Sequence, residues 1–333
     1  MVENLLYSGF RYPHHDENSG YDNVVVSPAN YVNGGTLLWG NAPIGTFRRR
    51  INFVLIDIAT VIRSWRYPYV LLFYPEHTAY FSPAVLRLLK KKVTCVLHLG
   101  PEFWFDSKGS IAVALKRANV RMAEQLIVLS SAQCEYCTKR FPGRVAWIPH
   151  GVWCDEKPID GSMVPVRPRR ISIVGNTYRD YETIIEVVRL IERSHPSITF
   201  DLVGVKPEKL SLIAKNKNVV FHKRLSPEQY RSTIEQSLFM LLPLRFATAN
   251  NALLESMSFG VPVYCSDVEG VKDYLISEEY VFRHSKEVIG ILDRRLQQSH
   301  ADAVRERTAL KRYARERFGW EKIRNEVIQR ATG

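Results

Sequence analysis

Short runs of apolar and β-branched residues alternate with helical patterns along the whole chain. The runs hold four to six apolar residues without polar alternation, which is typical of strands buried on both faces of a parallel sheet. The predicted strands of the first half are Asn4–Ser8, Tyr69–Phe73, Val93–His98, Gln125–Leu129 and Val145–Ile148. Those of the second half are Arg170–Val174, Thr199–Val203, Val219–His222, Phe239–Leu242, Pro262–Cys265 and Tyr280–Phe282.

Helical patterns lie between these strands. In Tyr181–Ser194 the apolar residues recur at helical spacing, so that one face is apolar. The segment Ser226-Pro227-Glu228-Gln229 predicts a helix start, with serine as N-cap, proline at the first helical position and glutamine completing a capping box. The alternation of strands and helices predicts an α/β protein with doubly wound sheets.

The periodic pattern breaks at residues 153–169, which contain three prolines and one glycine. Such a composition predicts a linker. We therefore expect a first domain at 1–155, a linker at 156–169 and a second domain at 170–310. Residues 311–333 are expected to form a C-terminal helix, with packing against the first domain left open. Ligands of such sheets bind beyond the carboxyl ends of the strands, in a cleft between the two domains.

The composition places the chain among globular proteins. Of its 333 residues, 46% are hydrophobic, enough for sizeable cores. We see no apolar run long enough to cross a bilayer and no signal-peptide pattern. The five cysteines are odd in number and scattered, and three of them fall at expected buried positions. This pattern favours a reducing compartment over a disulfide framework, so we expect a cytoplasmic protein.

The net charge is +12, and a split at residue 165 gives +5 and +7 for the two parts. This balance indicates an anionic partner: a phosphorylated small molecule, a membrane surface or a nucleic acid. The basic clusters 47–53 and 87–93 suit peripheral binding to the inner face of a membrane, and they also suit solvated helix faces. No nucleic-acid motif accompanies the charge, so we expect no nucleic-acid partner.

Two loops that follow strands carry candidate binding groups. Gly175 ends one strand, and Arg179 lies just before the next helix. Glycine permits a close approach of a ligand, and the new helix offers free N–H groups. An ordinary strand–helix turn with a surface arginine is the alternative.

The second loop belongs to the stretch ATANNALLESMSFGVPVYCSD, residues 247–267. A helix is expected to start near Asn250. Its first N–H groups, with those of Asn251, the Thr248 hydroxyl and Arg245, would hold a diphosphate. Glu255 follows about one turn later and could accept hydrogen bonds from vicinal hydroxyls. The alternative is a solvent-facing glutamate favoured by the helix dipole.

Four segments together resemble glycosyltransferases of the GT-B fold, in particular glycosyltransferase family 4. They are LLPLRFATANNALLESMSFGVPVYCSDVEGVKDYL, RMAEQLIVLSSAQCEYCTKRF…VAWIPHGV, ISIVGNTYRDYETIIEVVRLI and VVFHKRLSPEQY, which span residues 121 to about 275. The resemblance implies two Rossmann-like domains that face each other across a central cleft. It also implies a hexosyltransferase-type enzyme that moves a sugar from a nucleotide-diphosphate donor to an acceptor hydroxyl, with retention and without a metal or other cofactor.

The resemblance also implies roles for individual residues. Glu255 would bind the donor ribose, and the amides at 248–251 would hold the diphosphate, with Arg179 as the cation. The base would lie near His222 and Arg224, and His98, at a strand end, is the predicted catalytic residue. Candidates in the first domain are Gly20 on the donor side and, on the side of a saccharide, lipid-linked or small-molecule acceptor, His14, His15, Glu76 and Glu102.

The chain departs from the family pattern at two points. The family pairs two glutamates, and Ala247 occupies the place of the first, so that Asn250 or Thr248 would have to contact the sugar. The usual second-domain lysine has no match, since Tyr181 stands near its place, and Arg245 could supply that charge. Two alternatives therefore stay open: a nucleotide-sugar-binding protein with lost or altered turnover, and an inverting GT-B transferase.

Overall fold

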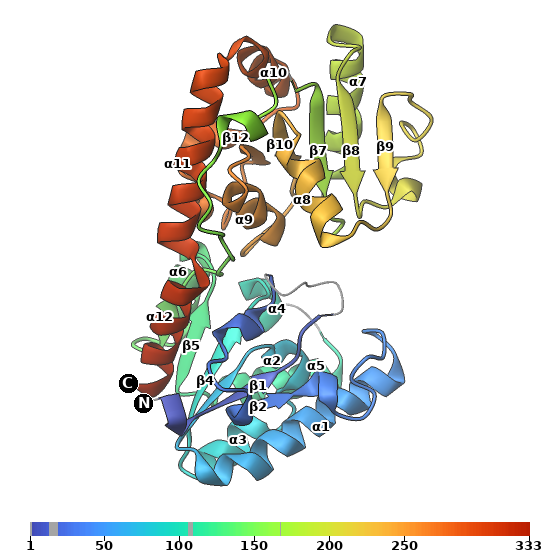
Figure 1. Ribbon diagram of the computed structural model, residues 1–333. Coiled ribbons are helices and arrows are strands. Elements are labelled where there is room, and N and C mark those ends of the chain that lie inside the picture. Colours follow the sequence, from blue (N-terminus) through green and yellow to red (C-terminus); the bar gives the residue numbers. More distant parts are fainter. Residues whose placement is uncertain (1, 13–18, 106–108, 167) are drawn as a thin grey trace. The chain divides into compact units, whose positions relative to one another are not determined.

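The structure is a computed structural model that describes residues 2–12, 19–105, 109–166 and 168–333 (Figure 1). The chain forms two compact units. Unit 1 contains residues 1–151 and 320–333, and unit 2 contains residues 152–319. The chain therefore passes between the units twice, and the two passages are hydrogen-bonded to each other through Val152 N–H and Phe318 O, 2.8 Å apart.

Unit 1 is built on a parallel sheet with the strand order β2-β1-β3-β4-β5-β6. Its strands are β1 (Leu5–Gly9), β2 (Tyr31–Asn33), β3 (Tyr69–Leu72), β4 (Lys92–Leu97), β5 (Gln125–Val128) and β6 (Val145–Trp147). All five strands predicted for this half are confirmed within one or two residues. The sequence missed β2 because it is an edge strand of three residues, too short to show a period.

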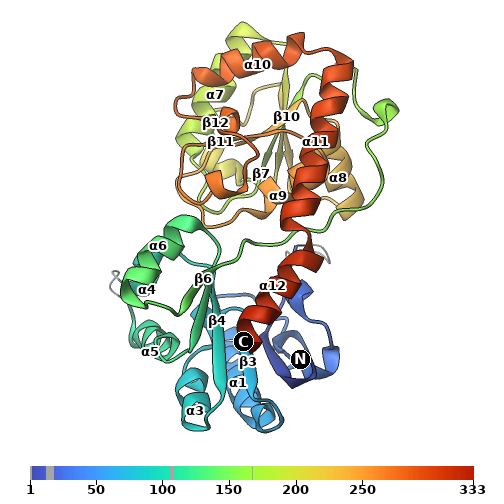
Figure 2. The same cartoon turned by 90° about the vertical axis from the view of Figure 1, so that its left-hand side faces the viewer.

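Helices flank this sheet, with α1 against β1 and β2 and α12 against β3, β4 and β5 (Figure 2). The helices of unit 1 are α1 (Phe47–Arg63), α2 (Pro75–Thr78), α3 (Ser82–Leu88), α4 (Pro101–Phe105), α5 (Ile111–Val120), α6 (Ser131–Arg140) and α12 (Trp320–Thr332). Gly151 lies against the Trp320 ring, where an added Cβ would come within 2.3 Å of a ring carbon. The C-terminal helix is thus an integral part of unit 1.

Unit 2 has a second parallel sheet, with the order β12-β11-β10-β7-β8-β9. The strands are β7 (Arg170–Val174), β8 (Thr199–Val203), β9 (Val219–His222), β10 (Phe239–Leu242), β11 (Val263–Ser266) and β12 (Val281–Phe282). All six are confirmed, four with identical bounds. The residues of β7 and β10 are almost all fully buried, as the uninterrupted apolar runs predicted.

The helices of unit 2 that the structure describes are α7 (Tyr181–Ser194), α8 (Pro227–Glu235), α9 (Asn251–Ser258), α10 (Glu287–Gln297) and α11 (His300–Phe318). The α8 capping box is confirmed, because Ser226 Oγ accepts from Gln229 N–H and the glutamine side chain accepts from Ser226 N–H. The helix predicted over 311–333 differs from the structure. Residue 319 separates α11 from α12, since the helical hydrogen bonds of α11 end there.

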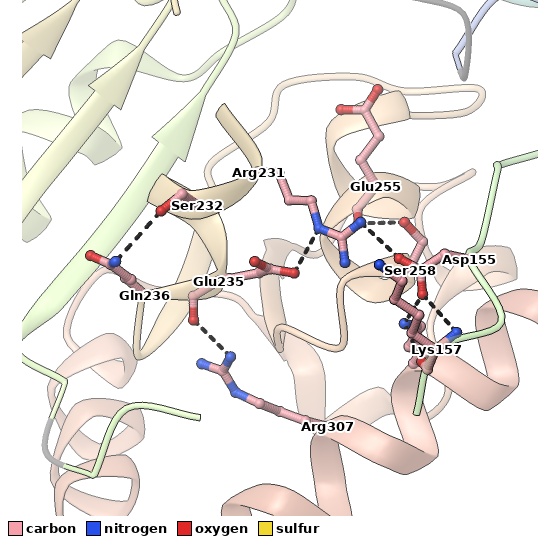
Figure 3. Close-up of polar contacts among 10 residues, drawn as sticks. Asp155, Lys157, Arg231, Ser232, Glu235, Gln236, Glu255, Ser258 and Arg307 are labelled. Carbon is pink, nitrogen blue, oxygen red and sulfur yellow. Dashed lines mark hydrogen bonds and ion pairs between the residues drawn. The ribbon is translucent and has the colours of Figure 1, made fainter. Parts of the chain in front are cut away.

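The segment predicted as a linker, 156–169, lies within unit 2. The reason is an ionic anchor at its start, drawn in Figure 3. Asp155 Oδ2 lies 2.7 Å from Arg231 Nη1. Lys311 Nζ contacts the same carboxylate and donates to Lys157 O at 2.7 Å. The prolines and the glycine therefore belong to an irregular segment whose start is held against unit 2 by these contacts.

All five cysteines are free thiols, and Cys95, Cys137 and Cys265 are buried. No described helix is long and apolar enough to span a bilayer.

Candidate functional site

The loop after β7 encloses a buried arginine. Gly175 has φ +81°, and a Cβ there would lie 2.9 Å from Arg179 Nη2. Arg179 is only 6% exposed. Its Nε donates to Val174 O at 2.7 Å, and its Nη1 donates to Thr177 O at 3.0 Å. Glycine is therefore needed at 175 for both the backbone turn and the space that the guanidinium occupies.

The charge of Arg179 is poorly compensated. Burial lowers the pKa of its guanidinium to about 10, while Cys265, Tyr230 and Tyr181 act weakly in the opposite direction. Within the described parts of the chain it forms no ion pair with a carboxylate, and its hydrogen bonds go to backbone carbonyls. A buried cation without a counter-ion is costly. An anionic ligand at the carboxyl ends of β7 and β10 would supply the missing charge.

The loop after β10 brings a helix N-terminus to the same edge of the sheet, because β7 and β10 are adjacent and parallel. Asn250 is the N-cap of α9, and its Oδ1 accepts from Leu253 N–H at 3.2 Å. Its side chain therefore caps the helix, a role that differs from the sugar contact considered from the sequence. Thr248 is buried beside it. The start of α9 presents its positive dipole end at this edge.

A tight contact fixes the loop that precedes α9. Gly270 has φ +82°, and a Cβ there would lie 2.3 Å from Ala247 O. Ala247 is 7% exposed and belongs to the apolar core of unit 2. The place at which the family resemblance would put a first glutamate is thus a buried apolar position.

Glu255 lies half-buried on α9, and it has a partner that the sequence did not suggest. The Tyr230 hydroxyl, on α8, donates to Glu255 Oε2 at 2.6 Å. Figure 3 shows the Glu255 carboxylate directed away from the Asp155–Arg231 ion pair. The charge of the Tyr230 hydroxyl group also favours the protonated form of Arg179, so that it raises the pKa of the guanidinium. The only sequence signal for Tyr230 was its place three residues into a well-capped helix.

In unit 1, His98 and Glu76 come together at the carboxyl ends of β4 and β3. His98 Nδ1 lies 3.8 Å from Glu76 Oε1, and the His98 ring packs against Tyr74 and Tyr21. Glu76 is 4% exposed, and burial raises the pKa of its carboxyl to about 8, which Lys116 partly offsets. At neutral pH, Glu76 is therefore mainly a neutral acid.

The other candidates of unit 1 do not join this pair. Glu102 lies exposed on α4. Gly20 is buried, but the space of its missing side chain is filled by Asp22, whose carboxylate pairs with Arg11 at 2.8 Å. His14 and His15 lie outside the described residues.

Part of the chain matches a family model. Residues 168–295 match the model described as glycosyl transferases group 1. This part of unit 2 is therefore similar to glycosyl transferases group 1. It contains Arg179, Tyr230 and Glu255 as well as both loops described above. No curated protein sequence matches the chain significantly.

Solved structures resemble the chain in fold. Sucrose-phosphate synthase from Thermosynechococcus elongatus is 17% identical, with a TM-score of 0.64, and the match covers 98% of this chain and 87% of that one. HepE from Anabaena, in complex with UDP and glucose, is 14% identical, with a TM-score of 0.61 and coverage of 87% and 83%. A variant of TarM from S. aureus, in complex with fondaparinux, alpha-GlcNAc-glycerol and UDP, is 14% identical, with a TM-score of 0.62 and coverage of 84% and 59%. The chain thus spans well under two thirds of the length of TarM. Its fold is GT-B.

Other candidates in residues 168–295 have surface or structural partners. Arg245 is 59% exposed and pairs with Glu182 at 3.2 Å and Asp180 at 3.4 Å. His222 Nε2 donates to the fully buried carboxylate of Asp201 at 2.8 Å, which also receives two hydrogen bonds from Arg170. The imidazole of His222 thus donates a hydrogen bond that stabilises a buried aspartate on the neighbouring strand. Arg224 is exposed beyond β9.

No group of three or more His, Cys, Asp or Glu side chains is arranged to hold a metal ion in the described parts of the chain. The expectation of a metal-free reaction stays a prediction.

Replacing Tyr230 with phenylalanine tests whether this residue positions Glu255. The change removes one hydroxyl, so the Glu255 carboxylate loses a charge-assisted hydrogen bond of 2.6 Å. Such a bond is worth about 1.5–3 kcal/mol, but solvent would replace part of it, so we expect the affinity for a nucleoside diphosphate, the ligand expected from the sequence, to fall by about three- to tenfold. Titration calorimetry measures the change. Unaltered affinity, with an unaltered melting temperature, would exclude a positioning role.

Replacing Glu76 with glutamine should alter how stability depends on pH. The pKa of Glu76 is raised from its ordinary value to about 8 in the folded protein, so its stabilising contribution is complete below about pH 4.5 and is lost as the pH rises to about 8. The glutamine variant stays neutral. Its stability relative to the parent protein should increase across this range, by up to roughly 5 kcal/mol. Melting temperatures of both proteins at pH 5, 7 and 9 measure the difference, and parallel curves would contradict the raised pKa.

Proposed function

We propose that the protein is a glycosyltransferase that moves a sugar from a nucleoside-diphosphate donor to an acceptor hydroxyl. The observation that carries the proposal is the buried, uncompensated guanidinium of Arg179, in a loop at the same end of the sheet as the N-terminus of α9. A diphosphate suits this position, because two negative charges would meet a buried cation and a helix dipole. The match of residues 168–295 to the group 1 family model and the UDP complexes of the fold neighbours HepE and TarM support the assignment.

The remaining donor contacts follow along the chain. Glu255, held by Tyr230, would accept hydrogen bonds from the ribose hydroxyls, about one helical turn from the loop that would hold the diphosphate. The base would lie toward β9 and Arg224. Arg179 and the amides of α9 would stabilise the charge that develops on the departing diphosphate, a role that in other enzymes a metal can fill. The reaction we propose is therefore independent of a metal.

The proposed reaction retains the anomeric configuration. The acceptor hydroxyl attacks the anomeric carbon from the side of the leaving group, the bond to the diphosphate breaks, and a diphosphate oxygen takes the hydroxyl proton. The acceptor would bind to unit 1 near His98 and Glu76, which are hydrogen-bonding groups at the ends of two strands. Its class is a saccharide, a lipid-linked sugar or a small hydroxylated molecule.

A thermal-shift panel of nucleosides, nucleotides and nucleotide sugars tests the function. A ligand that binds the folded state raises its apparent stability by mass action, so we expect nucleoside diphosphates to raise the melting temperature and nucleosides to do so far less. The best donor is then incubated with acceptor candidates, with and without a chelator. Product formation that survives the chelator, with the donor's anomeric configuration, supports the proposal. Binding without turnover would identify a nucleotide-sugar-binding protein. A product with inverted configuration would identify an inverting transferase. The absence of any nucleotide binding would refute the assignment.

Peripheral membrane binding is a further part of the proposed function, and it rests on one patch of unit 1. The basic–apolar patch comprises Ile62, Trp65, Arg66, Leu88, Leu89 and Lys90. Trp65 is 69% and Leu88 83% exposed. Lys91 Nζ donates to Trp65 O at 3.3 Å, which joins the two segments of the patch. The patch includes part of the basic cluster 87–93 noted in the sequence.

The other basic cluster, 47–53, is only partly at the surface. Arg49 is fully buried, with its guanidinium 4.7 Å from the Phe10 ring and 5.0 Å from that of Phe53. The helical spacing of Arg49, Phe53 and Ile56 places all three on the face of α1 that packs inward. The expectation that all of 47–53 is a surface cluster was therefore wrong for Arg49.

The patch predicts binding to anionic vesicles. Basic residues near such a surface contribute about 1 kcal/mol each, and the exposed apolar side chains can insert between head groups. We expect sedimentation with vesicles that contain phosphatidylglycerol, and little with neutral vesicles. The double change Trp65→Ser and Leu88→Ser should abolish binding, whereas Trp153→Ser, at an exposed tryptophan of unit 2, should not. Equal binding by both variants would contradict the patch.

A further inference from the structure

Unit 2 contains a cavity at the amino ends of β7 and β10, opposite to the carboxyl ends at which the Arg179 loop lies. Its volume is about 330 Å³, and its lining includes Arg169, Leu238, Arg295, Gln298, His300 and Arg307. Arg169 and Leu238 precede the first residues of β7 and β10. These strands have five and four residues, so roughly 13–17 Å of sheet separates the cavity from the loops at their carboxyl ends. The cavity is therefore distinct from the proposed donor site.

The first cation of this cavity, Arg307, is buried and pairs with no carboxylate of the described residues. It is 4% exposed, and its two terminal nitrogens donate to Glu235 O at 2.7 Å and Ser237 O at 2.6 Å. Figure 3 shows that Arg307 meets the backbone oxygen of Glu235, while the Glu235 carboxylate faces Arg231. Burial, and next the charge of Arg295, lower the pKa of Arg307 to about 10. Two buried cations thus repel each other here.

The neighbouring polar groups are incompletely satisfied. Arg295 is 8% exposed, and its Nη1 pairs with Glu306. That carboxylate also accepts from Gln298 at 3.0 Å and from Tyr280 at 2.7 Å. Arg295 Nε and His300 Nδ1 are buried and have no hydrogen-bond partner among the described residues. A buried donor without a partner costs about 1–3 kcal/mol, and a ligand with acceptor oxygens would offset this cost.

The charges of the lining favour an anion. Arg169 adds a third cation, exposed at the rim, and Glu306 is the one carboxylate that pairs with these arginines among the described residues. His300 is the first residue of α11, a helix of 19 residues, so the positive end of its dipole lies at the cavity. The nearby acid Asp302 is engaged with Ser299 and Arg305.

The other walls are apolar and include Val164, Leu238, Leu296 and Ala303. A volume of about 330 Å³ lies at the lower end of the range for small-molecule sites. We propose that this cavity binds a small organic phosphate monoester, with the phosphate at Arg307, Arg295 and His300 and the organic part against the apolar wall. A phosphate dianion fits better than a carboxylate, because it has three charged oxygens for donors that approach from several elements.

The test uses ribose 5-phosphate as probe, with ribose, inorganic phosphate and citrate as comparisons. Binding is measured by calorimetry with saturating UDP present, so that the proposed donor site is filled, and is repeated with Arg179→Met. We expect saturable binding of ribose 5-phosphate, weaker binding of inorganic phosphate and citrate, and none of ribose. Because the cavity is separate from the proposed donor site, ribose 5-phosphate binding to the cavity can be measured even if the protein does not bind UDP.

Two variants of Ala303 provide the matched pair. Ala303 lies in the first turn of α11, where aspartate is favourable for the helix. Ala303→Asp places a carboxylate beside the arginines and should weaken ribose 5-phosphate binding by about tenfold or more. Ala303→Asn has nearly the same shape without the charge and should retain most of the affinity. His300→Ala should reduce it several-fold.

Three results would overturn the proposal. They are the absence of saturable binding by the parent protein, equal affinity in the aspartate and asparagine variants, and citrate binding as tight as that of ribose 5-phosphate. Melting temperatures of the variants show whether each is folded. Should both Ala303 variants unfold, the parent protein and His300→Ala still decide between the outcomes.

Discussion

Replacing Glu255 with alanine is expected to lower the affinity for UDP by about 10- to 150-fold, while the fold stays intact. A hydrogen bond to a charged group is worth about 1.5–3 kcal/mol, which corresponds to this range. Glu255 is half-buried on α9, and its known partner is the Tyr230 hydroxyl. Alanine is a strong helix former, so α9 should tolerate the change.

Matched ligands and variants make this result specific. Glu255→Gln keeps the length of the side chain and should fall between the parent protein and Glu255→Ala. The loss should appear equally for UDP and uridine, because both contain the ribose, and should be much smaller for inorganic diphosphate. Unchanged affinity for UDP in calorimetry would refute the assignment of Glu255 to the ribose.

Replacing Arg179 with methionine should cause little or no loss of stability and a collapse of diphosphate binding, so that its dependence on the ligand is the reverse of that of Glu255→Ala. Methionine fills much of the same space and removes a buried cation whose carboxylate partner is absent from the described residues. Such replacements are often neutral or stabilising. A charged, buried phosphate contact is worth several kcal/mol, so the affinity for UDP should fall by about 100-fold or more. Uridine affinity should hardly change.

The control for this variant is Arg193→Met, at an exposed arginine in the last turn of α7. It makes the same chemical change outside the loop and should leave UDP binding intact. The measurements are calorimetric titrations with UDP and uridine, together with melting temperatures. If Arg179→Met keeps its UDP affinity but melts well below the parent protein, Arg179 is a structural residue and the proposed diphosphate position is wrong.

Sequence patterns were sufficient where each depended on its own segment. Uninterrupted apolar runs predicted eleven of the strands that the structure contains, because strands buried on both faces need such runs. The Ser226 capping box fixed the start of α8, and Gly175 with Arg179 was recognised as a loop pair. These features are determined by residues close together in the chain.

Contacts between residues far apart in the chain could not be predicted from these local patterns. Tyr230 and Glu255 are 25 residues apart, and their pairing depends on how α8 and α9 pack. The burial of Arg49 depends on Phe10, and strand β2 separates these two residues in the sequence. His222 was expected near a base, yet its ring is bonded to Asp201, a carboxylate on the neighbouring strand. Each of these depends on a partner that the local pattern does not specify.

By itself, the sequence determined the α/β class, the parallel strands and the two loops with Arg179 and Glu255, since period, caps and glycines act over a few residues. It also showed Ala247 at the place of a glutamate. Only the tertiary structure decided which charges are compensated. Arg245 and Arg179 are alike in the sequence, but one is exposed beside two carboxylates and the other is buried beside carbonyls. The burial and the pairing of a charged side chain determine its free-energy cost in the folded protein. Both depend on how segments distant in the sequence pack together.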